Sequence, residues 1–170
     1  NLTVFNPDDV AVDLFSGATP TIRNLIVNEA GQDWVFPQYW RYGIGLSVGA
    51  GSAPNIDGVV MDGMVTRGIN YWHNSGGVIR NVTITNVSGA TLAIAAGIWV
   101  EDSVPLIEHV SIDRADHGVL VRHTNDTLRT RVVMRDISIS NSMYKGLNID
   151  KTDHTNYTNY QAAIIEGLTI

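Results

Sequence analysis

One short phrase recurs along this chain, and it constrains the fold more than any other feature of the sequence. The phrase is an apolar residue, any residue, a small polar residue or glycine, and then two apolar residues one position apart. Its seven central positions are Asn1, Asn24, Gly58, Asn81, His109, Asp136 and Gly167. Asn, Asp, His and Gly are the residue types that tolerate a positive φ angle most readily. Each centre is therefore predicted to be a left-handed bend between two short strands.

A second phrase follows each bend after a loop. It alternates apolar and other residues with a period of two, which is the pattern of a strand with one buried face. Its copies lie at 9–12, 45–48, 68–71, 97–100, 118–121 and 146–149. Successive bends are 23, 34, 23, 28, 27 and 31 residues apart, and the variation falls in the loops. Three strands per repeat, joined by loops of variable length, predict a solenoid of about six coils.

The positions just before the bends test this register. If equivalent strands stack about 4.8 Å apart, equivalent side chains become neighbours. The outward positions alternate in charge: Arg23, Asp57, Arg80, Glu108, Arg135 and Glu166. The inward positions beside them are almost uniform: Ile22, Ile56, Ile79, Ile107, Met134 and Ile165. A wrong register would not place an ionic ladder beside an aliphatic one, so Ile56, Ile79 and Ile107 are expected to lie directly over one another.

These three strands per coil, the Asn-type bend and the stacked isoleucines resemble the right-handed parallel β-helix of the pectate-lyase-like superfamily. The resemblance covers residues 1–170 and implies an all-β, three-sided, right-handed solenoid in a single domain. It is specific for the fold and not for function, because the superfamily includes polysaccharide lyases and hydrolases, phage tailspikes, adhesins and surface-layer proteins. The chain starts at one bend and stops three residues after another, so we expect an uncapped segment of a longer protein.

In this superfamily, ligands usually meet the outward face of the strand that follows the long loop. Two outward columns are predicted there: Ala11, Ser47, Asn70, Trp99, Leu120 and Asn148, and beside it Asp13, Gly49, Trp72, Glu101, Arg122 and Asp150. Trp72 and Trp99 are expected to be near neighbours. An aromatic loop at 33–42 adds Trp34, Trp40 and Tyr42. Exposed indoles beside carboxylates suit a sugar ring, so these five aromatic residues are candidates for carbohydrate binding. The alternative is that the loop folds over the core or against a partner chain.

Glu101 and Asp150 are candidate catalytic carboxylates. Glycosidases place two carboxylates about 5 Å or about 6.5 to 9.5 Å apart, and two rungs of a sheet span roughly 9.6 Å. Arg122 lies on the rung between them, which favours an ionic ladder instead. Asp113 and Asp116 are further candidates, and Asp116-His117-Gly118 loosely resembles the Gly-His-Gly segment of polygalacturonase-like hydrolases. The stacked aspartates of the superfamily's calcium-dependent lyases have no counterpart here, so the chain is assigned no catalytic residue; an enzyme of this kind would be a polysaccharide lyase or glycoside hydrolase.

Composition argues against several other classes of function. The net charge is −6 with 11 Lys and Arg residues, which disfavours a nucleic-acid partner. The longest apolar run, 92–100, is about half the roughly 20 residues that a membrane span requires. The chain has no cysteine, which excludes disulfides and thiol chemistry. Its five histidines, His73, His109, His117, His123 and His154, share no short metal-ligand spacing, so neither a metal nor a cofactor is expected.

Five Asn-x-Ser/Thr sequons occur, at Asn1, Asn81, Asn86, Asn125 and Asn156, against about two expected by chance. They favour an exported, glycosylated surface, although a chain rich in Ser, Thr and Asn also produces sequons by accident. The preferred interpretation is an extracellular structural module on a cell or virion surface, in a surface layer, sheath, filament or adhesin, contacting copies of itself or other surface proteins. The alternative is a carbohydrate-active β-helix, such as a tailspike or a polysaccharide lyase or hydrolase, that binds polysaccharide along the face of Trp72 and Trp99.

Overall fold

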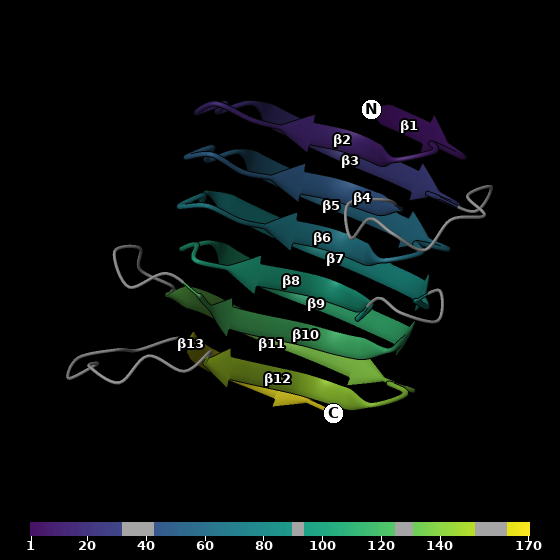
Figure 1. Ribbon diagram of the computed structural model, residues 1–170, viewed down its shortest axis with the longest axis vertical. Helices are drawn as coiled ribbons and strands as arrows, with labels where there is room; N and C mark the ends of the chain where they lie inside the picture. Colours follow the sequence, from purple (N-terminus) through teal and green to yellow (C-terminus); the bar gives the residue numbers. More distant parts are fainter. Residues whose placement is uncertain (32–42, 90–93, 125–130, 152–162) are drawn as a thin grey trace.

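The described part of the molecule consists of β-strands joined by turns and loops (Figure 1). The computed structural model describes residues 1–31, 43–89, 94–124, 131–151 and 163–170. Its strands are β1 (Leu2–Phe5), β2 (Val10–Leu14), β3 (Thr21–Asn28), β4 (Ile44–Val48), β5 (Asn55–Asp62), β6 (Arg67–Tyr71), β7 (Val78–Val87), β8 (Ala96–Glu101), β9 (Leu106–Ala115), β10 (His117–His123), β11 (Val132–Ser140), β12 (Lys145–Lys151) and β13 (Ala163–Thr169). The all-β class predicted from the sequence is confirmed.

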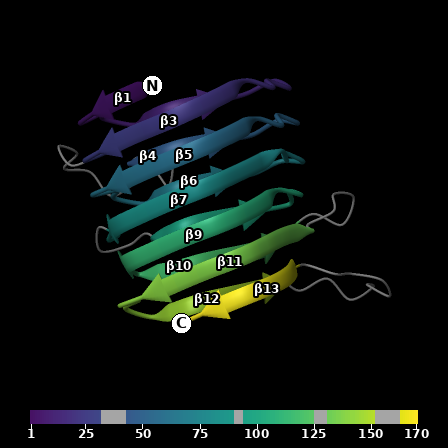
Figure 2. The ribbon, with the colours of Figure 1, turned by 180° about the vertical axis from the view of Figure 1, so that it is seen from behind.

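The strands pair in parallel and form two sheets. Sheet A has the order β1-β3-β5-β7-β9-β11-β13, and sheet B has the order β12-β10-β8-β6-β4-β2. Figure 1 shows sheet B toward the viewer, and Figure 2 shows sheet A from behind. Neighbours within each sheet come from successive coils of the chain, as in a parallel β-helix. The solenoid predicted from the repeated phrases is therefore confirmed.

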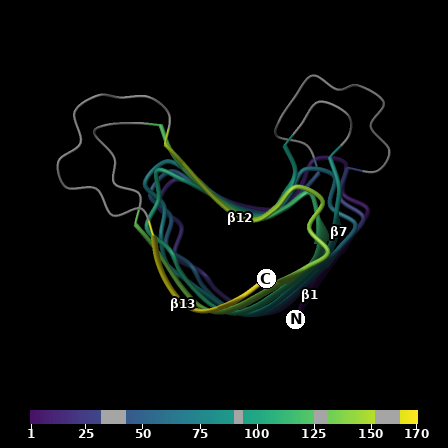
Figure 3. The ribbon, with the colours of Figure 1, turned by 90° about the horizontal axis from the view of Figure 1, so that it is seen from below.

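Every predicted bend with a measurable φ lies in the left-handed region. The angles are 53° at Asn24, 78° at Gly58, 55° at Asn81, 55° at His109, 54° at Asp136 and 67° at Gly167. Pairing continues on both sides of each bend, with Arg23 beside Asp57 before it and Leu25 beside Val59 after it. The two limbs predicted as separate strands are thus one strand of sheet A with a single left-handed residue. Figure 3 shows the result, in which the bent sheet A and sheet B enclose the interior from three sides.

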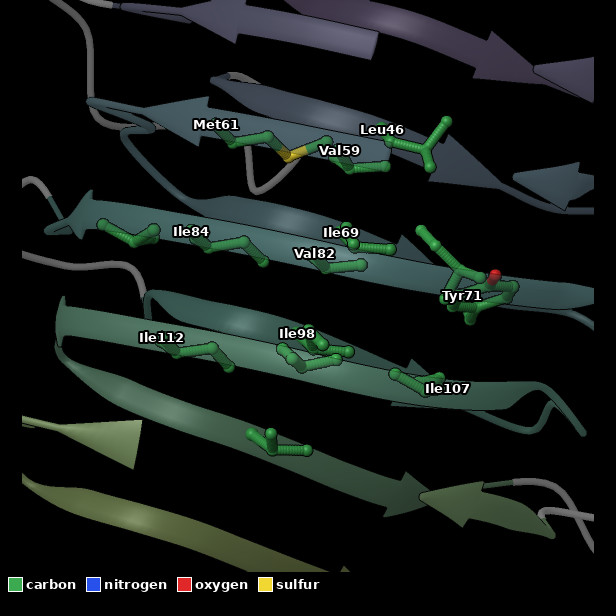
Figure 4. Close-up of a cluster of buried hydrophobic side chains, with 14 of the residues drawn as sticks. Leu46, Val59, Met61, Ile69, Tyr71, Val82, Ile84, Ile98, Ile107 and Ile112 are labelled. Carbon is green, nitrogen blue, oxygen red and sulfur yellow. The ribbon is translucent and has the colours of Figure 1, made fainter. Parts of the chain in front are cut away.

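The core lies between the two sheets and consists of stacked aliphatic side chains. Ile22 pairs with Ile56, Ile56 with Ile79, and Ile79 with Ile107. Ile56, Ile79 and Ile107 have no exposed surface, so the predicted isoleucine column is confirmed. Figure 4 shows neighbouring columns of the same kind, with Leu46, Ile69 and Ile98 of sheet B facing Val59 and Val82 of sheet A.

A second left-handed corner, which the sequence phrases do not predict, lies at or just after the end of six strands of sheet A, from β1 to β11. Its residues all have positive φ and follow the first bend by five positions: Asn6, Glu29, Gly63, Asn86, Arg114 and Asn141. The constant spacing of five was a usable signal. Glu29 and Arg114 obscured it, because neither residue type is common in the left-handed region.

The register of the first coil differs from the prediction by two residues. Val12 pairs with Leu46 and Asp13 with Ser47, so Ala11 and Asp13 were assigned to the wrong columns. Val10, Val12 and Leu14 are all apolar, and their alternation is equally compatible with both registers. The turn after β2 fixes the correct one, because the Gly17 amide donates to the Ala50 carbonyl of the next coil at 3.0 Å.

Candidate functional site: the outer face of sheet B

Three columns of side chains point away from the core on sheet B, and their chemistry changes from coil to coil. The first column is Val10, Ile44, Arg67, Ala96, His117 and Lys145, and the second is Asp13, Ser47, Asn70, Trp99, Leu120 and Asn148. The third contains Glu101, Arg122 and Asp150. It continues into Phe15, Gly49 and Trp72, which directly follow β2, β4 and β6, because the Gly49 and Trp72 amides extend the ladder to the preceding coil. The residues between the second and third columns, such as Val48 and Val100, belong to the core. This face therefore carries the polar and aromatic groups that coil stacking does not require.

Trp99 lies between two guanidinium groups. The Cζ atom of Arg67 is 4.0 Å from the centroid of the Trp99 ring, and that of Arg122 is 5.6 Å away. The indole Nε1 donates a hydrogen bond to Glu101 Oε2 at 3.1 Å. Cation–π contacts of this kind contribute about 0.5 to 2 kcal/mol each. The sequence predicts an exposed indole here, but the structure leaves only 5% of Trp99 exposed, so in this arrangement its ring is covered by protein.

Arg67 is a cation that is largely buried on this face, and the sequence phrases did not single it out. It is 8% exposed, and its Nη1 donates to Asn70 Oδ1 at 2.9 Å, while its buried Nε has no hydrogen-bond partner. Burial lowers the pKa of Arg67 to about 10, against an opposing attraction from Glu101 and with a smaller contribution from Arg122. The group still carries its charge at neutral pH. A buried, incompletely compensated charge is a common mark of a functional site.

Trp72 belongs to an aromatic cluster at the end of sheet B, which we define as Phe15, Trp72 and His73. The Trp72 ring lies 5.8 Å from that of Phe15 and 4.4 Å from that of His73. Gly49 makes this possible, because a Cβ atom there would collide with the indole. The indole Nε1 donates to Ser47 Oγ at 3.2 Å, which fixes the ring. Phe15 is 50% exposed, so the cluster presents apolar surface to solvent.

The two tryptophans thus have different surroundings, with Trp72 in the third column and Trp99 in the second. The remaining aromatic candidates, Trp34, Trp40 and Tyr42, lie outside the described residues.

The candidate carboxylates Glu101 and Asp150 occupy the third column with Arg122 between them, as predicted. Arg122 Nε lies 3.4 Å from Asp150 Oδ2. Glu101 accepts hydrogen bonds from Trp99 and, at 3.5 Å, from Thr124 Oγ1. A guanidinium therefore occupies the rung between the two carboxylates, which is the arrangement of an ionic ladder.

Asp113 and Asp116 do not join this column. Asp113 ends the outer row of β9 and accepts hydrogen bonds from Asn141 and Ser140, which hold the pKa of its carboxyl below the usual range. Asp116 accepts a hydrogen bond from the Gly89 amide at 3.0 Å. Glu101, Asp113, Asp116 and Asp150 therefore each have different hydrogen-bond or ion-pair partners and do not form a cluster.

His117 lies in the first column and stacks on Tyr144, with ring centroids 5.7 Å apart. Burial, and then the charge of Lys145, lower the pKa of His117, while Asp116 opposes them. Among the described residues, no group of three or more histidine or carboxylate side chains is placed to hold a metal ion.

A buried Asp–His pair, also not predicted, joins two coils where sheet B ends. His123 Nδ1 is 3.1 Å from Asp102 Oδ1, and both side chains are 2% exposed. The amide and the hydroxyl of Thr124 donate to Asp102 at 2.9 and 2.6 Å. The pair links the turn after β8 to the end of β10, and its two members are 21 residues apart in sequence.

Two of the candidate glycosylation sites, Asn81 and Asn86, occupy the two left-handed corners of β7. Their Nδ2 atoms donate to Asp57 and Asp62 of the preceding coil at 2.7 and 2.6 Å. A corner residue, an apolar residue and an outward hydroxyl also follow one another at 109–111, 136–138 and 167–169, without Asn. The repeat therefore produces a sequon where Asn at the first bend is followed two positions later by a hydroxyl-bearing residue, as at Asn81 but not at Asn24. Asn125 and Asn156 lie outside the described residues.

Within the part of the chain that the structure describes, no helix has the length and apolar character needed to cross a membrane. A search of curated proteins and a search of solved structures found no match. The family model described as the right-handed β-helix region matches residues 1–162. Its description agrees with the two parallel sheets and with the stacked columns of the core. The chain therefore belongs to the right-handed β-helix family.

Proposed function

We propose that this chain is a structural module on the outside of a cell or virion, in a surface layer, sheath, filament or adhesin. The observation that carries the proposal is the ionic ladder of sheet A. Arg80 lies 2.7 Å from Glu108, Glu108 lies 3.1 Å from Arg135, and Arg135 lies 2.9 Å from Glu166. Four successive coils are thus joined by one row of charge-assisted contacts, which suits a stiff rod.

The sheet B carboxylates support the same proposal, because Asp150 forms an ion pair with Arg122 of the neighbouring coil and Glu101 accepts a hydrogen bond from Trp99 of its own strand. The sequons at Asn125 and Asn156 support an exported surface, since neither begins a copy of the corner phrase. Copies of the same chain or other surface proteins are the partners in this proposal.

Electron microscopy of the purified protein, combined with a reducing-end assay on a panel of polysaccharides, tests the proposal. We expect rods or ordered assemblies and no release of new reducing ends. Detection of the protein by protease treatment of intact cells or virions tests its location. Discrete particles that do not associate and that cleave a saccharide would contradict the structural role.

Carbohydrate binding is a second candidate function, favoured by the aromatic cluster. Phe15, Trp72 and His73 present apolar ring surface, and the exposed Asp13 carboxylate lies in the next column, level with Ser47. Aromatic faces beside hydrogen-bond acceptors suit a pyranose ring, whose C–H groups stack and whose hydroxyls donate.

A glycan array tests this candidate. We expect the Trp72→Ala variant to bind any recognised glycan at least about tenfold more weakly, since it loses the central ring of the cluster. Tyr144→Ala is the matched control, because Tyr144 is an exposed aromatic residue stacked on a histidine at another place on the molecule. Equal binding by the wild type and both variants would exclude the cluster as the binding site.

A further inference from the structure

Two adjacent columns on the outer face of sheet A form a strip with an unusual composition. The first column is apolar and partly exposed: Val78, Leu106, Val133 and Ile164. The second is charged: Arg80, Glu108, Arg135 and Glu166. We call these eight residues the zipper strip. Both columns point outward, because the positions between them, including Ile79 and Ile107, are buried in the core.

The zipper strip begins at β7 and continues through β9, β11 and β13, which Figure 2 shows side by side. In β3 and β5 the apolar column is replaced by Thr21 and Asn55, both exposed. The change from polar to apolar is not required for coil stacking, since Thr21 and Asn55 stack in the same register. An outward apolar column of this kind indicates a contact with another molecule.

The charged column has a property that specifies its partner. Because its four charges alternate, reversing the order of the column about the midpoint between Glu108 and Arg135 places an opposite charge at every position. A second copy turned by a two-fold axis along the strand direction places its Glu166 opposite Arg80 and its Arg135 opposite Glu108. The same rotation places Leu106 opposite Val133 and Val78 opposite Ile164 of the second copy. The same two-fold rotation therefore pairs opposite charges in the charged column and apolar residues in the apolar column.

We propose that the zipper strip is a self-association surface that pairs two copies of this chain face to face. In this pair the coils of the two copies stack in opposite directions. The proposal rests on the proposed structural function and names the face that performs it. The apolar columns pack against each other as in two stacked sheets, about 10 Å apart. The charged columns lie beside them, where each ladder residue contacts an opposite charge of the second copy. A two-fold contact of this kind is the commonest way in which identical chains associate.

The size of the zipper strip sets the expected strength. Four rungs stacked about 4.8 Å apart cover much less than the roughly 800 Å² per partner of a standard interface. The dissociation constant is therefore expected to be on the order of 100 µM, and to rise with salt because exposed charges contribute. Several such contacts along a longer assembly would act together and strengthen one another.

The sharpest test is a variant in which the ladder is inverted by Arg80→Glu, Glu108→Arg, Arg135→Glu and Glu166→Arg. Alternation within β7 to β13 is preserved, so the variant is expected to fold, which circular dichroism checks, and to self-associate within about twofold of the wild type. Mixed with the wild type, it meets like charges unless it slips by one rung and loses contacts. Sedimentation velocity with one labelled species is expected to show mixed association at least about fivefold weaker than either self-association. Equal mixed and self-association would overturn the proposal, as would the absence of wild-type association at millimolar concentration.

A second pair of variants tests the apolar column separately. Leu106→Asn is expected to weaken self-association at least about threefold, because it removes apolar surface from the centre of the zipper strip. Ile26→Asn is the matched control, since Ile26 is an outward residue of the other limb of sheet A and is 38% exposed. A loss of association in Ile26→Asn alone would overturn the proposal. Rods that form from a mixture of the wild type and the inverted variant as readily as from either protein alone would overturn it too, while leaving the proposed structural function intact.

Discussion

The outward columns of sheets A and B follow different rules. On sheet A, the charged column from Arg23 to Glu166 alternates regularly from coil to coil, and the left-handed corners recur at equivalent positions. On sheet B, the second column passes from Ser47 through Asn70 and Trp99 to Leu120, with no shared property. A column that repeats contributes to contact between coils. A column that varies is not determined by that contact, so its residues are available for binding that is specific to one level of the molecule.

The largest effect is expected from the core column behind sheet A. Ile107→Ala leaves a cavity between Ile79 and Met134, because the fully buried side chain is packed from both neighbouring coils. We expect the free energy of unfolding to fall by about 3 kcal/mol. Urea denaturation followed by circular dichroism measures this change.

Ile26→Ala provides the control on the outer face of the same sheet. Its side chain is 38% exposed, so its loss is expected to reduce the free energy of unfolding by less than about 1 kcal/mol. Similar losses in the two variants would mean that the inward column does not determine the stability of the solenoid.

The left-handed corner of β7 is expected to show an intermediate effect. Asn81 has a φ of 55° and donates to Asp57. Asn81→Ala loses this hydrogen bond and places a Cβ-bearing residue without a polar side chain in the left-handed region, at an expected loss of about 1 to 2 kcal/mol. Asn81→Gly loses only the hydrogen bond, so it should cost less than about 1 kcal/mol. Equal stability of the two variants in urea would show that the corner is not strained.

The repeating features of sheet A were predictable because they depend on residues close together in the sequence. A bend at Asn24 or His109 follows from the residue type, and the ladder follows once the bends are aligned. The first coil shows the limit of this reasoning. Val10, Val12 and Leu14 allow two registers, and only the stacking of the turn at Gly17 on Ala50 selects one.

The features of sheet B were less predictable because they depend on residues that only the fold brings together. Trp99 was expected to be exposed, but guanidinium groups from two other coils cover it. Its neighbour Arg67 precedes the glycine at which the strand phrase begins, so the phrase did not include it. The Asp102–His123 pair likewise joins two coils, and neither residue belongs to a repeated motif.

The smallest effect on stability is expected at Arg67, and it contrasts the two sheets most directly. Burial lowers the pKa of Arg67 to about 10, which means that folding works against its charge. Arg67→Met keeps an extended side chain over Trp99 and removes the cost of burying the charge. It also removes the hydrogen bond that Arg67 donates to Asn70. We therefore expect the free energy of unfolding in urea at pH 7 to stay unchanged or to rise by up to about 1 kcal/mol.

Arg80→Met is the matched substitution on sheet A, and there the sign should be opposite. Hydrogen bonds from Arg80 and Arg135 lower the pKa of Glu108 from 4.5, so the folded state favours its charged form. That contribution is complete above pH 4.5 and is lost as the pH falls through the lower pKa of the folded state. Arg80→Met should therefore destabilise the protein at pH 7 and lose most of this effect in acid. The change in the free energy of unfolding caused by Arg67→Met should be similar at both pH values, because Arg67 stays charged at both. If Arg67→Met destabilised the protein as much as Arg80→Met, the Arg67 charge on sheet B would also stabilise the stacking of the coils, and the contrast between the two sheets would be wrong.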